Sequence, residues 1–323
     1  MNTDNTNRRR IIELLVRLGP LLGLALVYLL FVFVAPHSFS SAGNLQTILR
    51  QSTIVGIAAL GMTLVIISGG IDLSVGSTIA LTTVIIAWLL DRTTAGPLAA
   101  ALGGILTAAF VGWVIGMLVT TLRIVPFIVT LGMMLLVRGV AKGVAAEQKI
   151  DAPLSWLNDL LAAGRAWEWP VGVWMMLVLA LAVAATLRYT RFGRHVFAVG
   201  SNQQTARLCG VRVERVKVLV YTISGALAGV AGLMQFSRLT VGDPTVAVGR
   251  ELDVIAAVVI GGGSLSGGEG TILGSIIGAL IMTVIRNGCS QMGLPNWVQE
   301  IVTGIIIVLA VGLDRLRQRR TAP

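Results

Sequence analysis

The sequence predicts an all-α polytopic membrane protein with about ten transmembrane helices, some of them short or glycine-broken, and with both termini in the cytoplasm. Charged residues make up only 12% of the 323 residues and hydrophobic residues make up 55%, whereas a soluble domain carries about 25% charged residues. The mean hydropathy is correspondingly high, at +0.86. The apolar residues also occur in long runs, without the periodicity of half-buried strands or helices.

Ten runs are close to the twenty or so apolar residues that cross a bilayer. The predicted spans are 18–36, 52–68, 73–90, 97–122, 125–145, 170–187, 218–237, 251–263, 271–287 and 297–313. The eighth is short for a complete span. The first follows three arginines, as a secretion signal would, but its length and the lack of a small-residue cleavage site after it predict an uncleaved helix.

The basic residues predict the orientation of these spans. If the N-terminus lies inside, the inner segments contain sixteen of the 25 Lys and Arg residues, as the positive-inside rule expects. An even number of spans returns the C-terminus to the cytoplasm. The connection 146–169 is then outside and the basic connection 188–217 is inside. Because no linker or low-complexity tract divides the chain, residues 1–323 are predicted to form a single transmembrane domain.

Two glycine-rich segments, 66–77 and 259–270, interrupt the apolar runs, and both read Gly-Gly, then Leu-Ser, then Gly. Irregular backbone at membrane depth is tolerated where protein or a water-filled cavity surrounds it, so matching breaks in two halves are typical of a transporter's pathway. Ordinary glycine-rich turns at the cytoplasmic surface would give the same pattern. The sequence leaves both interpretations open.

Asp72 and Asp253 are the carboxylates nearest to membrane depth. A charge at mid-bilayer costs about 2.5–3.5 kcal/mol, so it normally faces a partner or a cavity. Because both lie near predicted span ends, capping a helix N-terminus is an equally good explanation. With these two carboxylates, the candidate substrate pathway comprises the uncharged polar residues Ser74, Ser264, Ser266, Asn287 and Gln291, which suit a polar, uncharged substrate bound weakly.

The connection 188–217 contains a short predicted helix. Ser201 or Asn202 can cap its N-terminus, and Gly210 can end it in the left-handed conformation. It is much shorter than the 12–15 or so residues that an isolated helix needs, so it requires a surface to dock on. We expect a face with Ala206 and Cys209 to enter a groove of a partner.

This loop, with Arg212, Arg215, Lys217 and Tyr221 after it, resembles the coupling segment of the ribose/xylose/arabinose-type permeases of ATP-binding-cassette importers. The resemblance includes 69–77, 251–262, 264–268 and 287–288, and it extends from about residue 40 to 313. The chain departs from the family pattern at Gly263, where Thr is common. It departs again at 289–292, which the family keeps apolar with one Asn. These departures leave the identity of the sugar open.

The resemblance implies the permease subunit of an importer in the bacterial inner membrane, embedded in lipid, that translocates a monosaccharide such as a ribose-like pentose by ATP-driven alternating access. It implies a second permease copy, an extracytoplasmic sugar-binding protein and a cytoplasmic ATPase with two nucleotide-binding domains. A homodimer is expected, although the sequence does not fix whether the partner permease is identical. The ATPase would use the ATP and Mg. Its contact with this chain would comprise Ser201, Asn202, Thr205, Ala206, Arg207, Cys209 and Gly210.

Other classes of function find less support. The chain lacks the Gly-x-x-x-x-Gly-Lys-Ser/Thr motif that cradles ATP, so we expect no enzymatic activity in this subunit. Two cysteines and two histidines predict neither a metal site nor a cofactor, and the dispersed basic residues predict no nucleic-acid partner. An ion-coupled secondary transporter of a small polar solute is the main alternative. An intramembrane enzyme is another, and both would depend on Asp72 and Asp253.

Overall fold

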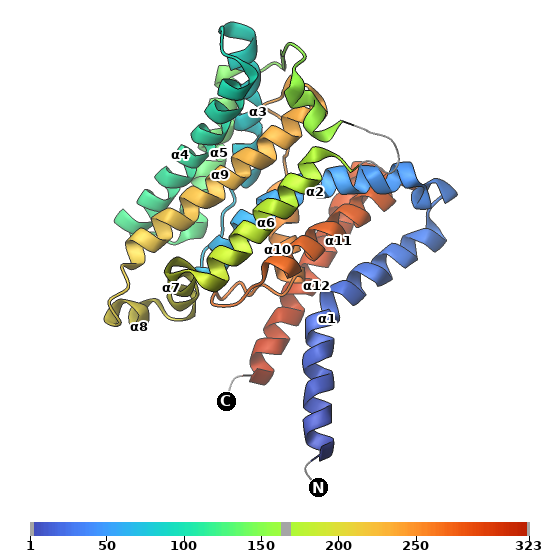
Figure 1. The fold of residues 1–323 in the computed structure, drawn as a ribbon, viewed down its shortest axis with the longest axis vertical. Coiled ribbons are helices and arrows are strands. Elements are labelled where there is room, and N and C mark those ends of the chain that lie inside the picture. Colours follow the sequence, from blue (N-terminus) through green and yellow to red (C-terminus); the bar gives the residue numbers. More distant parts are fainter. Residues whose placement is uncertain (1–2, 163–168, 322–323) are drawn as a thin grey trace.

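The computed structural model describes residues 3–162 and 169–321 and is almost entirely helical (Figure 1). The elements are α1 (Thr3–Val34), η1 (His37–Ser40), α2 (Ala42–Ile67), α3 (Val75–Arg92), α4 (Pro97–Thr121), α5 (Pro126–Val144), β1 (Ile150–Asp151), η2 (Trp156–Leu161), α6 (Val171–Tyr189), α7 (Arg191–Ser201), α8 (Gln203–Leu208), α9 (Val213–Leu239), β2 (Val241–Gly242), α10 (Arg250–Ile260), α11 (Ile272–Gln291) and α12 (Asn296–Thr321).

Each of the ten predicted ranges contains a helix, and α7 and α8 lie in the connection between the sixth and seventh ranges. Within the described residues, seven helices are long and apolar enough to cross a membrane: α2, α3, α4, α5, α6, α9 and α11. The apolar parts of α1 and α12 are shorter, at Gly19–Val34 and Asn296–Leu309. α10 has only 11 residues. The prediction of a helical multi-pass membrane protein is therefore confirmed.

The interior of the bundle is centred on α2 and α9. α9 packs against α2, α3 and α4, and α2 also contacts α11 and α10. The largest buried side chains include Tyr221, Phe236 and Leu60. In contrast, α4, α5 and α6 expose large apolar side chains such as Leu106, Leu135 and Leu181. Such a surface would be unfavourable in water and is typical of helices that face lipid.

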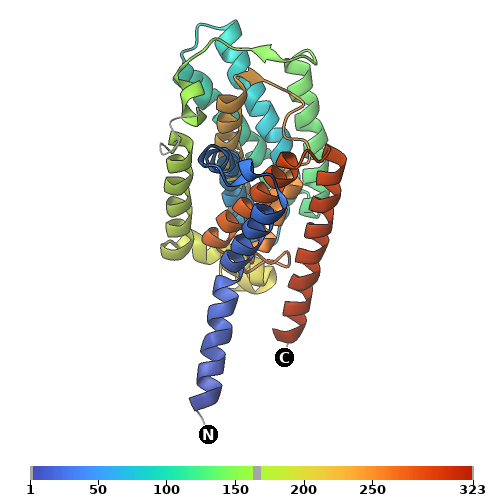
Figure 2. The ribbon, with the colours of Figure 1, turned by 90° about the vertical axis from the view of Figure 1, so that its right-hand side faces the viewer.

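The two ends of the bundle differ. At one end, α7 and α8 connect α6 to α9, and both chain termini project beyond this end (Figures 1 and 2). At the other end, β1 and β2 form a two-residue antiparallel ladder that pairs Ile150 with Gly242 and Asp151 with Val241. This ladder joins the long connection after α5 to the segment that precedes α10. We call these the α8 end and the ladder end.

Candidate functional site

The short helix predicted in the basic loop is present as α8, which has six residues. Of the two candidate caps, Asn202 is the one used: its Oδ1 accepts a hydrogen bond of 2.9 Å from the backbone N–H of Thr205. Ser201 is the last residue of α7. Gly210 has a φ of +82°, in the left-handed region, and its N–H donates to the carbonyl of Arg207. The predicted start and end of this helix are therefore confirmed.

The predicted outward face of α8 is wrong in one respect. Ala206 is buried, with 4% of its surface exposed, because its small side chain lets α8 lie directly on the rest of the chain. Leu208, two residues further on and so on another face of the helix, is 88% exposed. Thr205, Arg207, Cys209 and Gly210 are exposed as well. Leu208 was not among the predicted contact residues, although a lone large apolar residue in a polar loop helix was a usable signal.

Two polar contacts hold α8 against the first turns of α9. Arg207 forms an ion pair with Glu214, and Lys217 Nζ donates a 2.9 Å hydrogen bond to Gln203 Oε1. Because the side chains of Arg207 and Glu214 are both about half exposed, this pair orients α8 more than it stabilises the fold. The helix is thus braced on its own chain while Leu208 stays free for a partner.

The two glycine-rich segments meet each other at the C-terminal end of α7. The backbone N–H of Gly268 donates a 2.9 Å hydrogen bond to the carbonyl of Ile67. A Cβ at Gly200 would overlap that same carbonyl oxygen, and a Cβ at Gly267 would lie 2.7 Å from the carbonyl oxygen of Gly200. We call this contact of 67–70, 200 and 267–268 the glycine junction. It lies in turns beside the α7–α8 connection, and Ile67, Ser68 and Gly70 are buried in it.

Asp72 is buried directly before α3, and its Oδ1 accepts hydrogen bonds from Ser74, at 2.9 Å from the backbone N–H and 2.6 Å from the hydroxyl. These bonds form a turn that leads into α3, but the N-cap residue of that helix is Ser74 and no side chain caps its first N–H groups, so the predicted cap by Asp72 is not formed. Asp243 forms the same turn at the ladder end, with Thr245 as the donor at 2.8 and 2.6 Å. Lys149 Nζ lies 3.3 Å from its other oxygen. Burial alone would raise the pKa of Asp243, but the bonds from Thr245 and Lys149 together lower it below its ordinary value.

Asp253, near the start of α10, is fully buried and forms ion pairs with two arginines. Arg286 of α11 approaches it with Nη2 at 2.9 Å from Oδ1 and Nε at 2.8 Å from Oδ2. Arg250 Nη1 lies 3.6 Å from Oδ2. Of these contacts only the one from Arg286 Nη2 to Oδ1 is a hydrogen bond, and Oδ2 is held by charge alone; a hydrogen bond between ionised groups is among the stronger ones in proteins. Asp253 was among the predicted site residues but neither arginine was, although the charge of Arg286 inside the predicted span 271–287 was a usable signal.

Charged groups continue from this site toward α5 and α9. Arg138 of α5 donates to the carbonyls of Pro244 and Val246, at 3.0 and 2.7 Å, and lies within electrostatic range of Glu251. Arg250 lies within range of Arg238. We call the charged side chains of Lys149, Asp243, Arg138, Arg238, Arg250, Glu251, Asp253 and Arg286 the ionic network.

Asn287 and Gln291 of α11 bond to the start of α2. Asn44 Nδ2 donates to Asn287 Oδ1 at 2.9 Å, and Gln291 Nε2 donates to Asn44 Oδ1 at 3.0 Å. Ser264 and Ser266 lie in the turn after α10, where the N–H of Ser266 donates to Ser264 Oγ at 3.2 Å. The predicted pathway residues therefore occupy separate places, and the structure does not gather them around one cavity.

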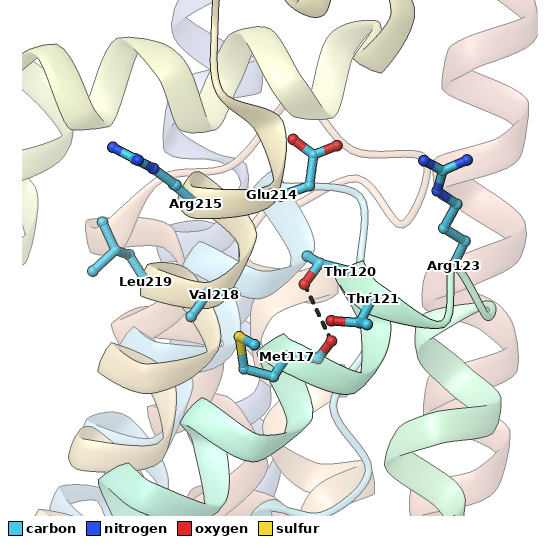
Figure 3. A pocket seen from close by; sticks show the side chains of 8 residues that line it. All are labelled: Met117, Thr120, Thr121, Arg123, Glu214, Arg215, Val218 and Leu219. Atoms are coloured by element: carbon cyan, nitrogen blue, oxygen red, sulfur yellow. Dashed lines mark hydrogen bonds between the residues drawn. The ribbon is translucent and has the colours of Figure 1, made fainter.

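A groove of about 630 Å³ opens between the end of α4 and the start of α9 (Figure 3). It is lined by Met117, Thr120, Thr121, Arg123, Glu214, Arg215, Val218 and Leu219. The groove was not predicted from the sequence, because the two helix ends are far apart in the chain. Elsewhere in the described residues, no group of three or more His, Cys, Asp or Glu side chains is placed to hold a metal ion.

Comparison with known proteins identifies relatives over most of the chain. Residues 44–311 match the family described as branched-chain amino acid transport system / permease component. The chain is 40% identical over 296 residues to the ribose import permease protein RbsC of Escherichia coli strain K12, covering 91% of this chain and 92% of that protein.

Two further relatives carry the names of other sugars. The L-arabinose ABC transporter permease protein AraH of Azospirillum brasilense is 36% identical over 301 residues, covering 92% of this chain and 88% of its own. The xylose transport system permease protein XylH of Escherichia coli strain K12 is 32% identical over 362 residues, covering 91% and 90%. No solved structure matches the chain.

Proposed function

Since the chain belongs to the family of branched-chain amino acid transport system permease components, we propose that it is the membrane-spanning subunit of an ATP-driven importer for a monosaccharide. A permease subunit of this family is not an enzyme by itself, and this one is a multi-pass protein of the inner membrane. The family description names amino acids, but the relatives above are named for ribose, arabinose and xylose. Those names support a ribose-like pentose or a related sugar as the substrate.

The proposed assembly contains two identical permease copies, an extracytoplasmic sugar-binding protein and a cytoplasmic ATPase with two nucleotide-binding domains. The ATPase binds ATP and Mg, and the permease requires no cofactor of its own. Closure of the ATPase moves α8, and the glycine junction passes this movement to α2 and to the turn between α10 and α11. The membrane helices then alternate between outward and inward access.

α8 is the observation that carries this proposal. It is capped at both ends, braced by Arg207 and Lys217, and too short to persist by itself. Its exposed Leu208 offers an apolar anchor to a partner. These features support a coupling contact through Ser201, Asn202, Thr205, Arg207, Leu208, Cys209 and Gly210, with Ala206 packing behind it.

The proposed topology has ten spans in a single domain of residues 1–323, with α1, α10 and α12 completing the seven long helices. The α8 end faces the cytoplasm, and the projection of both termini beyond that end supports their cytoplasmic placement (Figure 1). The pathway assignment of Asp72, Ser74, Asp253, Ser264, Ser266, Asn287 and Gln291 remains a proposal. Each of them also has bonds that support local structure.

An ion-coupled transporter is the alternative, and the environment of the two carboxylates argues against it. A proton- or sodium-coupled mechanism needs a carboxylate that changes partners during transport. Asp72 accepts two bonds from Ser74, and Asp253 is enclosed by Arg250 and Arg286. Both side chains are therefore occupied by groups of the chain itself.

A substitution of Leu208 tests the proposal. Leu208→Asp removes the apolar anchor without touching the core, so we expect the ATPase to be lost on co-purification and ATP-dependent uptake to fall at least tenfold, about 1.4 kcal/mol of coupling. Leu154→Asp is the matched control, because Leu154 is 82% exposed in the connection after α5. Retention of the ATPase and of uptake in Leu208→Asp would overturn the assignment.

The substrate requires a separate measurement. Uptake into proteoliposomes with the cognate binding protein, screened over pentoses, hexoses and polyols, should give its highest rate with a pentose. A rate confined to branched-chain amino acids would instead support the solute class in the family description.

A further inference from the structure

The groove between α4 and α9 has an amphipathic lining. Arg123, Glu214 and Arg215 lie at its rim, with Arg123 and Arg215 on opposite sides of the carboxylate (Figure 3). Met117, Val218 and Leu219 form an apolar wall away from the charges. The hydroxyls of Thr120 and Thr121 lie between the two parts. A ligand that fits must be charged at one end and apolar along the rest of its length.

The rim carries an excess of positive charge. Glu214 is engaged by Arg207 of α8, so its charge is already matched. Arg123 lies within electrostatic range of Glu214, yet within the described residues no salt bridge engages Arg123 or Arg215, and both are exposed. The two guanidinium groups lie on opposite sides of the Glu214 carboxylate and point away from each other (Figure 3). Each is therefore open at the rim, where a guanidinium can donate paired hydrogen bonds to a phosphate oxyanion.

The surroundings identify the source of that phosphate. Large exposed apolar residues flank Arg123 in the connection from α4 to α5: Leu122, Ile124, Val125 and Phe127. On the other wall, Leu219 is half exposed. The groove therefore opens where lipid-facing surface gives way to the charged α8 end, which is the level of lipid headgroups.

We propose that this groove binds an anionic phospholipid from the leaflet at the α8 end. Its phosphate pairs with Arg123 at the rim, in the positive field of Arg215, and an acyl chain covers Met117, Val218 and Leu219. Basic pockets between membrane helices at the cytoplasmic surface suit acidic headgroups on general electrostatic grounds. Free phosphate would leave the apolar wall uncovered, and a neutral lipid would leave the two arginines unmatched.

The site adjoins the brace of α8, and this consequence rests on the proposed transport function. Glu214 belongs both to the rim and to the ion pair with Arg207. A phosphate paired with Arg123 withdraws that cation from Glu214 and leaves the carboxylate to Arg207. The bound lipid thereby holds α8 in its docking position.

Lipid binding by the purified full-length permease tests the site without any measurement of transport. Native mass spectrometry is carried out with phosphatidylglycerol and with phosphatidylcholine of the same acyl chains. The test variant is Arg123→Gln/Arg215→Gln. The control is Arg188→Gln/Arg191→Gln, which removes two exposed arginines at the same end of the molecule but outside the groove. Circular dichroism and size-exclusion chromatography establish that both variants are folded.

We expect phosphatidylglycerol to bind more tightly than phosphatidylcholine, and the test variant to lose about tenfold or more of this affinity at low salt. The control should lose less than about twofold. Equal binding of the two lipids, equal losses in both variants, or displacement of the lipid by millimolar inorganic phosphate would each overturn the proposal. So would loss of the co-purifying ATPase from the test variant, because the arginines would then belong to a protein contact.

Discussion

The glycine junction and the ionic network each join parts of the chain that are distant in sequence, but they do so through different groups. At the glycine junction, Ile67, Gly200 and Gly268 approach through main-chain atoms. In the ionic network, Asp253 and Arg286 meet through long charged side chains. Main-chain contact tolerates almost no added atom, whereas a charged pair tolerates changes of shape but not the loss of one charge. The two regions should therefore fail under different substitutions.

The largest expected effect is in the ionic network. Asp253→Asn leaves Arg250 and Arg286 without their common anion, and breaking a buried pair costs about 3–5 kcal/mol. Because the two arginine side chains are about one-quarter exposed, we expect about 3 kcal/mol, the lower end of that range. The measurement is thermal unfolding of the purified protein in detergent.

Asp91→Asn is the matched control for this substitution. The pair of Asp91 with Arg92 is exposed on both sides, so its loss should cost less than about 0.5 kcal/mol. Partial recovery in Asp253→Asn/Arg286→Gln would show that the unpaired cation causes the damage. Equal unfolding temperatures for Asp253→Asn and Asp91→Asn would show that the buried ion pairs of Asp253 stabilise the fold no more than an exposed pair does.

The next effect is at the glycine junction. Gly200→Ala adds one methyl group, which would overlap the carbonyl of Ile67, and overpacking of this kind costs about 1–3 kcal/mol. We expect a value near 2–3 kcal/mol, because the obstructing atoms are backbone and cannot change rotamer. Thermal unfolding and uptake should both decline.

Gly132→Ala in α5 makes the same chemical change where a Cβ has nothing within 4 Å. There the higher helix propensity of Ala should leave stability unchanged or slightly raised. If the two alanine variants behave alike, main-chain contact does not hold the junction together.

A smaller effect depends on pH. The pKa of Asp243 is lowered in the folded state by its bonds from Thr245 and Lys149, while an unfolded Asp has a pKa of about 3.9. Its contribution is therefore present above about pH 4 and is lost as the pH falls through the lower, folded-state pKa.

Asp243→Asn should accordingly cost about 1 kcal/mol at pH 7, the value of a typical hydrogen bond, and less as the solution is acidified. The measurement is the unfolding temperature of the parent protein and of Asp243→Asn, from pH 7 down to the lowest pH at which the protein stays soluble in detergent. A difference that grows on acidification would contradict the assigned direction.

The smallest expected effect is local to α8. Asn202→Ala removes the N-cap and costs about 1 kcal/mol of helix stability, but Arg207 and Lys217 still hold α8 on α9. Hydrogen exchange should speed up within 203–208 while the global unfolding temperature stays constant. Loss of global stability would show that α8 is integral to the fold.

Long apolar runs made the helices predictable, because a bilayer imposes both their length and their composition. The ends of the loop helix were predictable for a different reason: Asn202 and Gly210 fix them through local hydrogen bonds and local backbone conformation. The burial of Ala206 and the partners of Asp253 were not, because both depend on packing between helices that no local pattern describes. The same limit hid the groove, whose walls come from residues almost one hundred positions apart in the chain.

Gly200 contributes no side chain, and this has a mechanical result. A side chain at a helix contact can change rotamer when its neighbour is displaced, whereas peptide groups in contact have no rotamer to change. Any shift of the last turn of α7 must therefore move the carbonyl of Ile67 and the turn at Gly268 by a comparable distance. A displacement applied to the exposed face of α8 is thus passed through the end of α7 to the end of α2 and to the turn after α10.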